Sequence, residues 1–195
     1  MSTAHISCEG LDSIFLAMWK MTAHSAVVND NRKFFKNAVP FFLAALRVLV
    51  KGENDSVLEP LLGVLSNIAA AQQSWRVLVT LPVPIIDCVA DCVNQRTKFT
   101  GRLLLRFLCV FHNVVVWEEG AVFFLLTRQG CHIAVNRLCS VATSFVFERQ
   151  EDRESFVNVA RGLLASLRKA SVKYHLAITA DLASALTNFL LMTKI

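Results

Sequence analysis

The sequence has few of the residues that end helices or turn a chain. Of its 195 residues only seven are glycine and four are proline, and runs that alternate polar and apolar residues, as strands do, are nearly absent. Apolar residues recur instead every third or fourth position, as in VLEPLLGVLSNIA at residues 57–69, which places them in one stripe along a helix. The pattern predicts an all-α protein.

A long uninterrupted apolar run is also missing, although 54% of the residues are hydrophobic and only 18% are charged. The densest stretch, LLLRFLCVFHNVVVW at residues 103–117, is broken by Arg106, His112 and Asn113, whereas a membrane-spanning helix needs about 20 apolar residues. The N-terminal MSTAHISCEG has neither the basic nor the apolar region of a secretory signal. We expect an intracellular protein, cytoplasmic or nuclear, that has large buried faces, spans no membrane and is not secreted.

The motifs of catalysis and of metal or cofactor binding are absent. Cys88 and Cys92 lie four residues apart on one helix, but a structural zinc site takes four ligands, usually in two close pairs, and no second pair follows. The six cysteines are therefore interpreted as reduced thiols buried among apolar residues. No phosphate-binding loop, dinucleotide-binding glycine motif or pair of catalytic carboxylates occurs. We expect no enzymatic activity, no cofactor and no metal.

A repeat runs through the chain. NRKFFKNAVPFFLAAL aligns with SWRVLVTLPVPIIDCV so that Arg32 falls on Arg76 and Pro40 falls on Pro84, an offset of 44 residues. Two weaker copies follow, FLLTRQGCHIAVNRL and KYHLAITADLASALTNFL, and an apolar helix of one design precedes each copy. Proline is tolerated in the first turn of a helix, where its missing N–H would be unbonded in any case. The alignment therefore predicts that Pro40 and Pro84 open helices.

The repeat divides one domain, 1–195, into four approximate units: 1–50, 51–95, 96–147 and 148–195. A helix pair of this size cannot bury its apolar face alone, but stacked neighbours can. We therefore expect a right-handed α-solenoid of about four units, with a continuous core and an extended groove. The chain starts without a polar capping helix, which favours a piece or short isoform of a longer array over a chain that docks end to end.

The second unit, LLGVLSNIAAAQQSWRVLVTLPVPIIDCV, resembles an armadillo repeat. The pattern of that family is a helix ending aLsNLa, a short link, and a helix opened by Gly-x-Ile-Pro. EGLDSIF and KNAVPFFLAAL fit the same pattern, while the third and fourth units are degenerate and leave HEAT-like repeats as an alternative. The resemblance implies a solenoid fold and, for function, a non-catalytic scaffold or adaptor that binds a peptide or partner domain along a groove.

The resemblance also points to a set of binding residues. On a helical wheel of residues 58–69, Asn67 lies opposite the buried leucines, beside Gly63 and Pro60. In armadillo proteins this position faces the concave groove, where an asparagine amide can hold the backbone of an extended peptide. The partner-binding residues expected from it are Trp19, Asn67, Arg106, Asn113, Arg161 and Lys169. An alternative of equal weight is that Asn67 and Asn113 only bond the backbone of the neighbouring unit.

The expected groove departs from that of the family's nuclear-import members, which pair each asparagine with a tryptophan one turn earlier. Here Trp19 is followed by Ala23 where the asparagine should be, and Asn67 is preceded by Gly63 where the tryptophan should be. The groove is also not acidic, because the three cations of the binding set lie in or beside it. We expect a neutral or acidic peptide or protein partner rather than a basic import signal.

A second class of function uses the net charge of +5. NRKFFK at residues 31–36 is the densest basic spot, and a solvated helix face is its simpler interpretation. A nucleic-acid or other anionic-surface binder would use this spot together with further cations: Arg76, Arg96, Lys98 and Arg102. Salt separates the two classes, because contacts to phosphates weaken steeply as salt is added. We expect nucleic acid not to be the partner.

Overall fold

The computed structural model describes residues 10–52, 54–71, 85–127 and 129–192, and every regular element among them is an α-helix. The predicted all-α class is confirmed. The helices are α1 (Leu11–Thr22), α2 (Ser25–Asp30), α3 (Arg32–Lys51), α4 (Asp55–Ala70), α6 (Ile85–Gln95), α7 (Gly101–Val115), α8 (Glu118–Thr127), α9 (Gln129–Ser144), α10 (Gln150–Tyr174) and α11 (Ala180–Met192).

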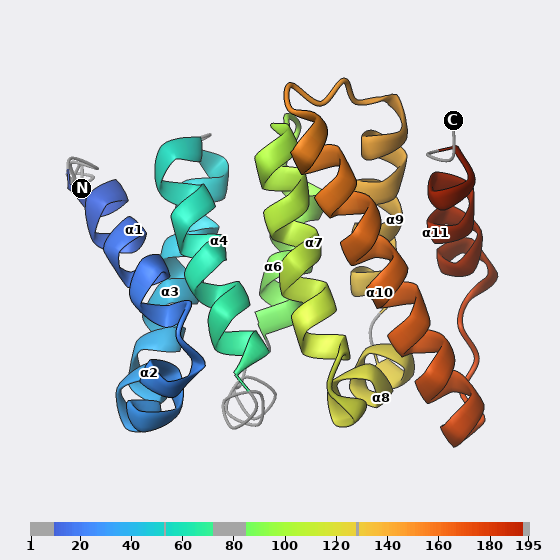
Figure 1. Ribbon diagram of the computed structural model, residues 1–195, viewed down its shortest axis with the longest axis horizontal. Helices are drawn as coiled ribbons and strands as arrows, with labels where there is room; N and C mark the ends of the chain where they lie inside the picture. The colour runs from blue at the N-terminus through green and yellow to red at the C-terminus, as the bar shows by residue number, and fades with distance from the viewer. Residues whose placement is uncertain (1–9, 53, 72–84, 128, 193–195) are drawn as a thin grey trace, which may run out of the picture.

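The longer helices form two layers. Helices α1, α4, α7 and α10 pack side by side in sequence order and make the front layer of Figure 1. Helices α3, α6, α9 and α11 pack on one another in the same order and make the rear layer. Each of the four predicted units thus contributes one helix to each layer, while the exact limits of the units stay a prediction.

The core lies between the two layers and is continuous along them. Phenylalanines fill much of it, and Phe107, Phe111, Phe124 and Phe156 are among its largest fully buried side chains. The rings of Phe111 in α7 and Phe124 in α8 meet edge to face, with their centroids 6.3 Å apart. Such pairs stabilise a core beyond the area that they bury, so these phenylalanines serve to pack the core.

Helix α4 is buried on more sides than its sequence pattern suggests. The helical wheel places Pro60 and Gly63 on the outer side with Asn67, yet Pro60 and Gly63 are buried and Asn67 is half-buried. The reason is α1, which covers this side of α4. A Cβ atom on Gly63 would lie 2.4 Å from the indole ring of Trp19, so only glycine permits the two helices to approach this closely.

The prediction that Pro40 opens a helix is wrong, because α3 begins at Arg32 and continues through Pro40. A proline inside a helix removes one backbone hydrogen bond and usually kinks or breaks it. Pro40 is exposed, so water can reach the carbonyl group that lacks its usual partner. Its aligned counterpart Pro84 lies outside the described residues, as does Arg76, the counterpart of Arg32.

No single helix in the described part of the chain is both long enough and apolar enough to span a bilayer. Helix α7 and residues 118–126 of α8 would pass that test only as a pair, and they are bent by 107° to each other.

A buried arginine fixes the link between α6 and α7. Arg96 is only 3% exposed, and its guanidinium forms an ion pair with Asp55 at the start of α4. Its Nε donates to the carbonyl oxygen of Lys98 at 2.6 Å, and Arg137 of α9 donates to the carbonyl oxygens of Asn94, at 2.7 Å, and Arg96. Arg96 therefore holds the fold together and is not part of an exposed basic face, which corrects the role considered for it above.

Replacing Arg96 by methionine should destabilise the protein strongly. The change leaves the Asp55 carboxylate without its partner, and breaking a buried ion pair costs about 3 kcal/mol or more. Because the Asp55 side chain is 35% exposed, we expect about 2 to 3 kcal/mol in urea unfolding. The exposed Arg168→Met in α10 is the control and should change stability by less than about 0.5 kcal/mol. Equal stability of the two variants would contradict this role of Arg96.

Candidate partner-binding face

All six predicted binding residues lie in the front layer. Trp19 belongs to α1, Asn67 to α4, and the remaining four to α7 and α10. The structure brings Trp19, Asn67 and Arg106 into one cluster, and it places Asn113 one helix further along. Arg161 and Lys169 lie apart from that cluster, on α10. We call the exposed surface of these four helices the front face.

The two asparagines bond to the helix that precedes their own. Asn67 Nδ2 donates to the carbonyl oxygen of Trp19 at 3.1 Å and to Thr22 Oγ1 at 3.2 Å. Asn113 Nδ2 donates to the carbonyl oxygen of Ser66 at 3.0 Å and to its Oγ at 2.9 Å. Of the two roles that the sequence left open, the geometry shows the contact to the neighbouring unit. A role in partner binding stays a prediction.

Trp117 reinforces the second of these contacts. Its indole Nε1 donates to the carbonyl oxygen of Ala69 at 3.2 Å. The carbonyl groups in the last turn of a helix lack partners within that helix, so Trp117 satisfies one at the end of α4. Asn113 and Trp117 are four residues apart and together close the interface between α4 and α7.

Trp19 and Arg106 form the half-buried centre of the front face. The Arg106 guanidinium carbon lies 4.4 Å from the centroid of the indole ring, a cation–π geometry. Glu59 of α4 lies between two arginines, with its carboxylate oxygens 3.9 Å from Arg106 Nε and 3.9 Å from Arg102 Nη1. A hollow of about 210 Å³ beside this cluster is lined by residues that include Leu16, Trp19 and Glu59. The single carboxylate of Glu59 offsets one of the two positive charges here.

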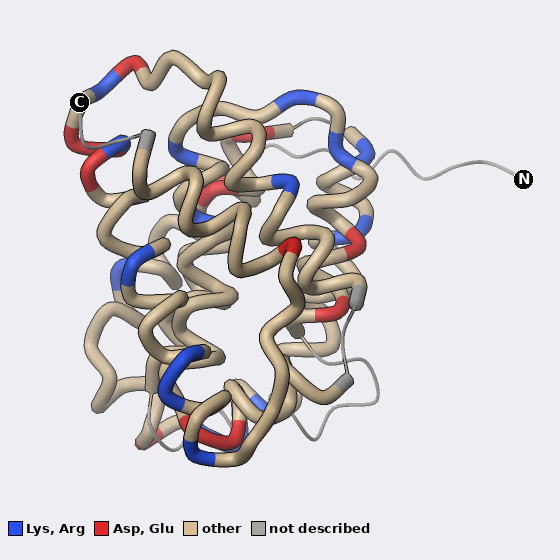
Figure 2. Tube along the Cα trace, turned by 90° about the vertical axis from the view of Figure 1, so that its right-hand side faces the viewer, with Lys and Arg blue, Asp and Glu red and all other residues tan. Residues whose placement is uncertain are grey.

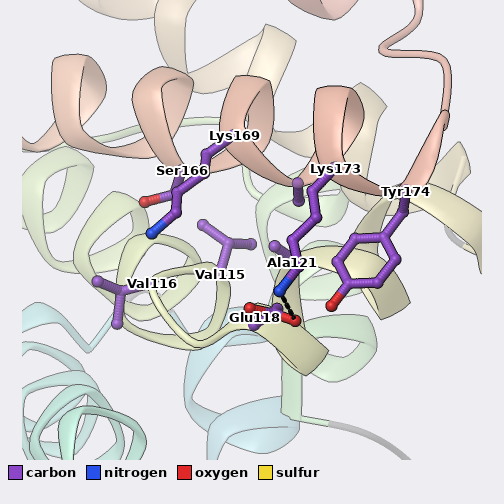
Figure 3. A pocket seen from close by; sticks show the side chains of 9 residues that line it. Val115, Val116, Glu118, Ala121, Ser166, Lys169, Lys173 and Tyr174 are labelled. Atoms are coloured by element: carbon purple, nitrogen blue, oxygen red, sulfur yellow. Dashed lines mark hydrogen bonds and ion pairs between the residues drawn. The ribbon is translucent and has the colours of Figure 1, made fainter.

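A second hollow, of about 220 Å³, lies where α7, α8 and α10 meet. Figure 3 shows Lys173 extending from α10 to Glu118, while Ser166 and Lys169 lie side by side on α10 above Val115 and Val116. Lys173 Nζ is 2.7 Å from Glu118 Oε1 and 5.2 Å from the centroid of the Tyr174 ring. Sequence reasoning found Lys169 but missed Ser166 and Lys173, although Lys173 follows Lys169 by one helical turn.

The cations of the front face differ in what they contact. Arg102 and Arg106 share Glu59, and Lys173 has Glu118. Exposed Arg161 donates from Nη1 to Asn158 Oδ1 at 3.1 Å, which leaves its charge uncompensated. Within the described ranges, no carboxylate pairs with Lys169. Uncompensated positive charge therefore collects on α10.

Most of the cysteines that the structure describes are buried. Cys88, Cys92, Cys131 and Cys139 are buried free thiols, and burial raises the pKa of Cys139 to about 12, which keeps it protonated and unreactive. Across the residues that the structure describes, no three His, Cys, Asp or Glu side chains are placed to share a metal ion.

No protein-family model matches this chain, and no curated protein sequence matches it either. The front face is therefore interpreted from its own geometry. Its asparagines and Trp117 join neighbouring helices, and its uncompensated cations lie on α10.

Replacing the asparagines should test their structural role. Asn67→Ala and Asn113→Ala each remove two hydrogen bonds to the preceding helix, and each bond contributes about 1 kcal/mol net. We expect each variant to lose about 1 to 2 kcal/mol in urea unfolding. Asn158→Ala on the exposed surface of α10 is the matched control and should be nearly neutral. Variants as stable as the wild type would show that these amides do not hold the helices together.

His132 makes the stability of the protein depend on pH. Burial lowers its pKa, and this outweighs the opposing effect of the hydrogen bond to the carbonyl oxygen of Phe124. Since a carbonyl only accepts, His132 Nε2 must carry the proton in that 3.1 Å contact, and Nδ1 then faces Thr179 Oγ1 at 3.5 Å. The folded protein thus favours the neutral ring.

Because the unfolded chain binds the proton more readily, stability should be fully present above about pH 6.5 and should fall as the pH is lowered below that value. His132→Gln keeps a polar side chain but cannot titrate, so its unfolding free energy should depend less on pH between about 7 and 5. His24→Gln at an exposed position should keep the wild-type slope. Identical slopes for wild type and His132→Gln, measured by urea unfolding, would contradict the assignment.

Proposed function

We propose that this chain is a non-catalytic scaffold or adaptor, built as a right-handed α-solenoid of armadillo-like units, that holds a peptide or partner domain along its front face. The observation that carries the proposal is a contact repeated at nearly constant separation. In the front layer Asn67 bonds Trp19 and Asn113 bonds Ser66, 48 and 47 residues back along the chain.

The rear layer repeats in the same way. Cys88 Sγ lies 3.7 Å from the carbonyl oxygen of Leu43, and Cys131 Sγ lies 3.6 Å from that of Ile86, each contact spanning 45 residues. A separation near 46 residues in both layers supports one structural unit used several times. Stacked units of this kind present an extended surface that suits elongated partners.

The charge of the front face supports a neutral or acidic partner. Arg161 and Lys169 are exposed on α10, and neither has a carboxylate partner among the residues that the structure describes. A carboxylate on the partner would gain an ion pair there and would be drawn to the face before contact. A basic partner would instead meet like charge.

Site-specific cross-linking tests the proposal. A photo-reactive amino acid replaces Ala165, which is exposed on α10, or Ala44, which is exposed on α3 of the rear layer. After irradiation in cells, we expect one protein to be cross-linked through Ala165 and not through Ala44, and Arg161→Glu should reduce its yield about tenfold. Mass spectrometry identifies the cross-linked segment.

The same cross-linked proteins at both positions, with yields that Arg161→Glu does not change, would contradict a binding role of the front face. Unfolding curves of each variant show whether any lost cross-link reflects lost structure.

A second candidate, binding to nucleic acid or another anionic surface, rests on α3. Arg32, Lys33 and Lys36 are exposed there, and the helix carries no acidic residue. Burial of Arg96 removes one member of the basic face considered for this role, and Arg76 lies outside the described residues. Figure 2, which faces the opposite end, bearing α10 and α11, shows cations and anions interspersed along the chain there. The first candidate is therefore favoured.

A further inference from the structure

The first two interfaces between successive front-layer helices carry hydrogen bonds from an asparagine, and a hollow lies beside the third. Asn67 joins α4 to α1, and Asn113 with Trp117 joins α7 to α4. The sequence alignment of the units sets Lys169 of α10 against Asn113, and Lys173 follows Lys169 by four residues, as Trp117 follows Asn113. Two lysines thus stand where the preceding interface has two neutral donors to the helix end.

The hollow of about 220 Å³ lies where α10 meets the end of α7 and the start of α8. Its floor is apolar and includes Val115 and Val116 at the end of α7, while Ser166, Lys169 and Lys173 line the side formed by α10. We call it the lysine pocket. A water molecule takes about 30 Å³ of liquid volume, so the pocket has room for a small polar group and part of an aliphatic chain.

We propose that the lysine pocket binds the carboxylate of an acidic side chain in the partner segment. The ammonium group of Lys169 and the hydroxyl of Ser166 would donate to the carboxylate oxygens, and an apolar neighbour in the segment would cover Val115 and Val116. The proposal rests on the proposed function of the front face, because it assigns one subsite within it.

The balance of charge favours a carboxylate over a phosphate. Glu118 already pairs with Lys173 at 2.7 Å, so the pocket holds about one uncompensated positive charge, that of Lys169. One carboxylate matches this charge, whereas a phosphate monoester carries close to two negative charges at neutral pH. The Glu118 pair also holds the Lys173 side chain at the pocket wall, which lowers the entropy lost when a ligand binds.

The exposed Val116 favours a partner segment with an apolar residue beside the acidic one. Its side chain is 49% exposed, and Val115 beside it is buried. Covering exposed apolar surface contributes about 25 cal/mol per Å². The segment we expect therefore alternates acidic and apolar side chains, so that one residue reaches Lys169 while the next packs on Val116.

Binding of a defined peptide tests the inference. The probe is a short fluorescein-labelled peptide that alternates glutamate and leucine, and its control has glutamine in place of glutamate. We expect the glutamate peptide to bind wild-type protein about tenfold more tightly than the control, measured by fluorescence anisotropy. In methyl NMR spectra, the signals of Val115 and Val116 should shift on titration.

Variants on α10 separate binding in the lysine pocket from a general effect of positive charge. Lys169→Gln should weaken the glutamate peptide about tenfold, while Arg168→Gln, which removes the same charge from the next position of α10, should change it less than about twofold. Ser166→Ala removes only the hydroxyl and should weaken binding about threefold. The control peptide should bind all four proteins alike.

Equal effects of Lys169→Gln and Arg168→Gln, or unshifted Val115 and Val116 signals during binding, would contradict binding in the lysine pocket. Neither result would contradict the proposed function of the front face. Failure of the glutamate peptide to bind wild-type protein would also overturn it. The proposed function is then judged separately by the cross-linking through Ala165, which needs no acidic probe. Matching unfolding curves for Lys169→Gln and Arg168→Gln show that both variants are folded.

Discussion

The rest of the structure depends on how closely α4 packs against the helices beside it. Its leucines face the core, Gly63 admits the indole ring of Trp19 from α1, and its last turn receives Asn113 from α7. A helix that is apolar on most sides is stable only when neighbours cover each of those sides. The order of the front layer, with α4 between α1 and α7, follows from this requirement.

Much of the fold could be predicted from the sequence, because it depends on patterns that a single helix carries. The all-α class came from the spacing of apolar residues, and the copies of one helix design led to the alternation between layers. Pro40 was expected in the first turn of a helix, where proline costs no hydrogen bond. It lies inside α3 instead, and its exposure lets water reach the carbonyl group that lacks a partner. That exposure depends on which side of α3 packs on the core.

The candidate site was predicted less well, because its chemistry depends on contacts between distant residues. Asn67 was found on the correct helix, but its hydrogen bonds end on residues 48 and 45 positions away. Arg96 looked like a solvated cation because its partner Asp55 is 41 residues distant in sequence. Lys169 was identified through its alignment with Asn113, and only the packed structure shows that it lines a pocket.

Hydrogen-bond donors in the front layer hold neighbouring helices together. A donor used in this way is not free to bind another molecule. The amides of Asn67 and Asn113 point to a neighbouring helix, so their donors are already occupied when a partner arrives. At the third interface the donors are ammonium groups, which reach further and retain a charge. Where one copy departs from this pattern, as α10 does at Lys169, the side chain stays exposed and its charge has no carboxylate partner among the described residues.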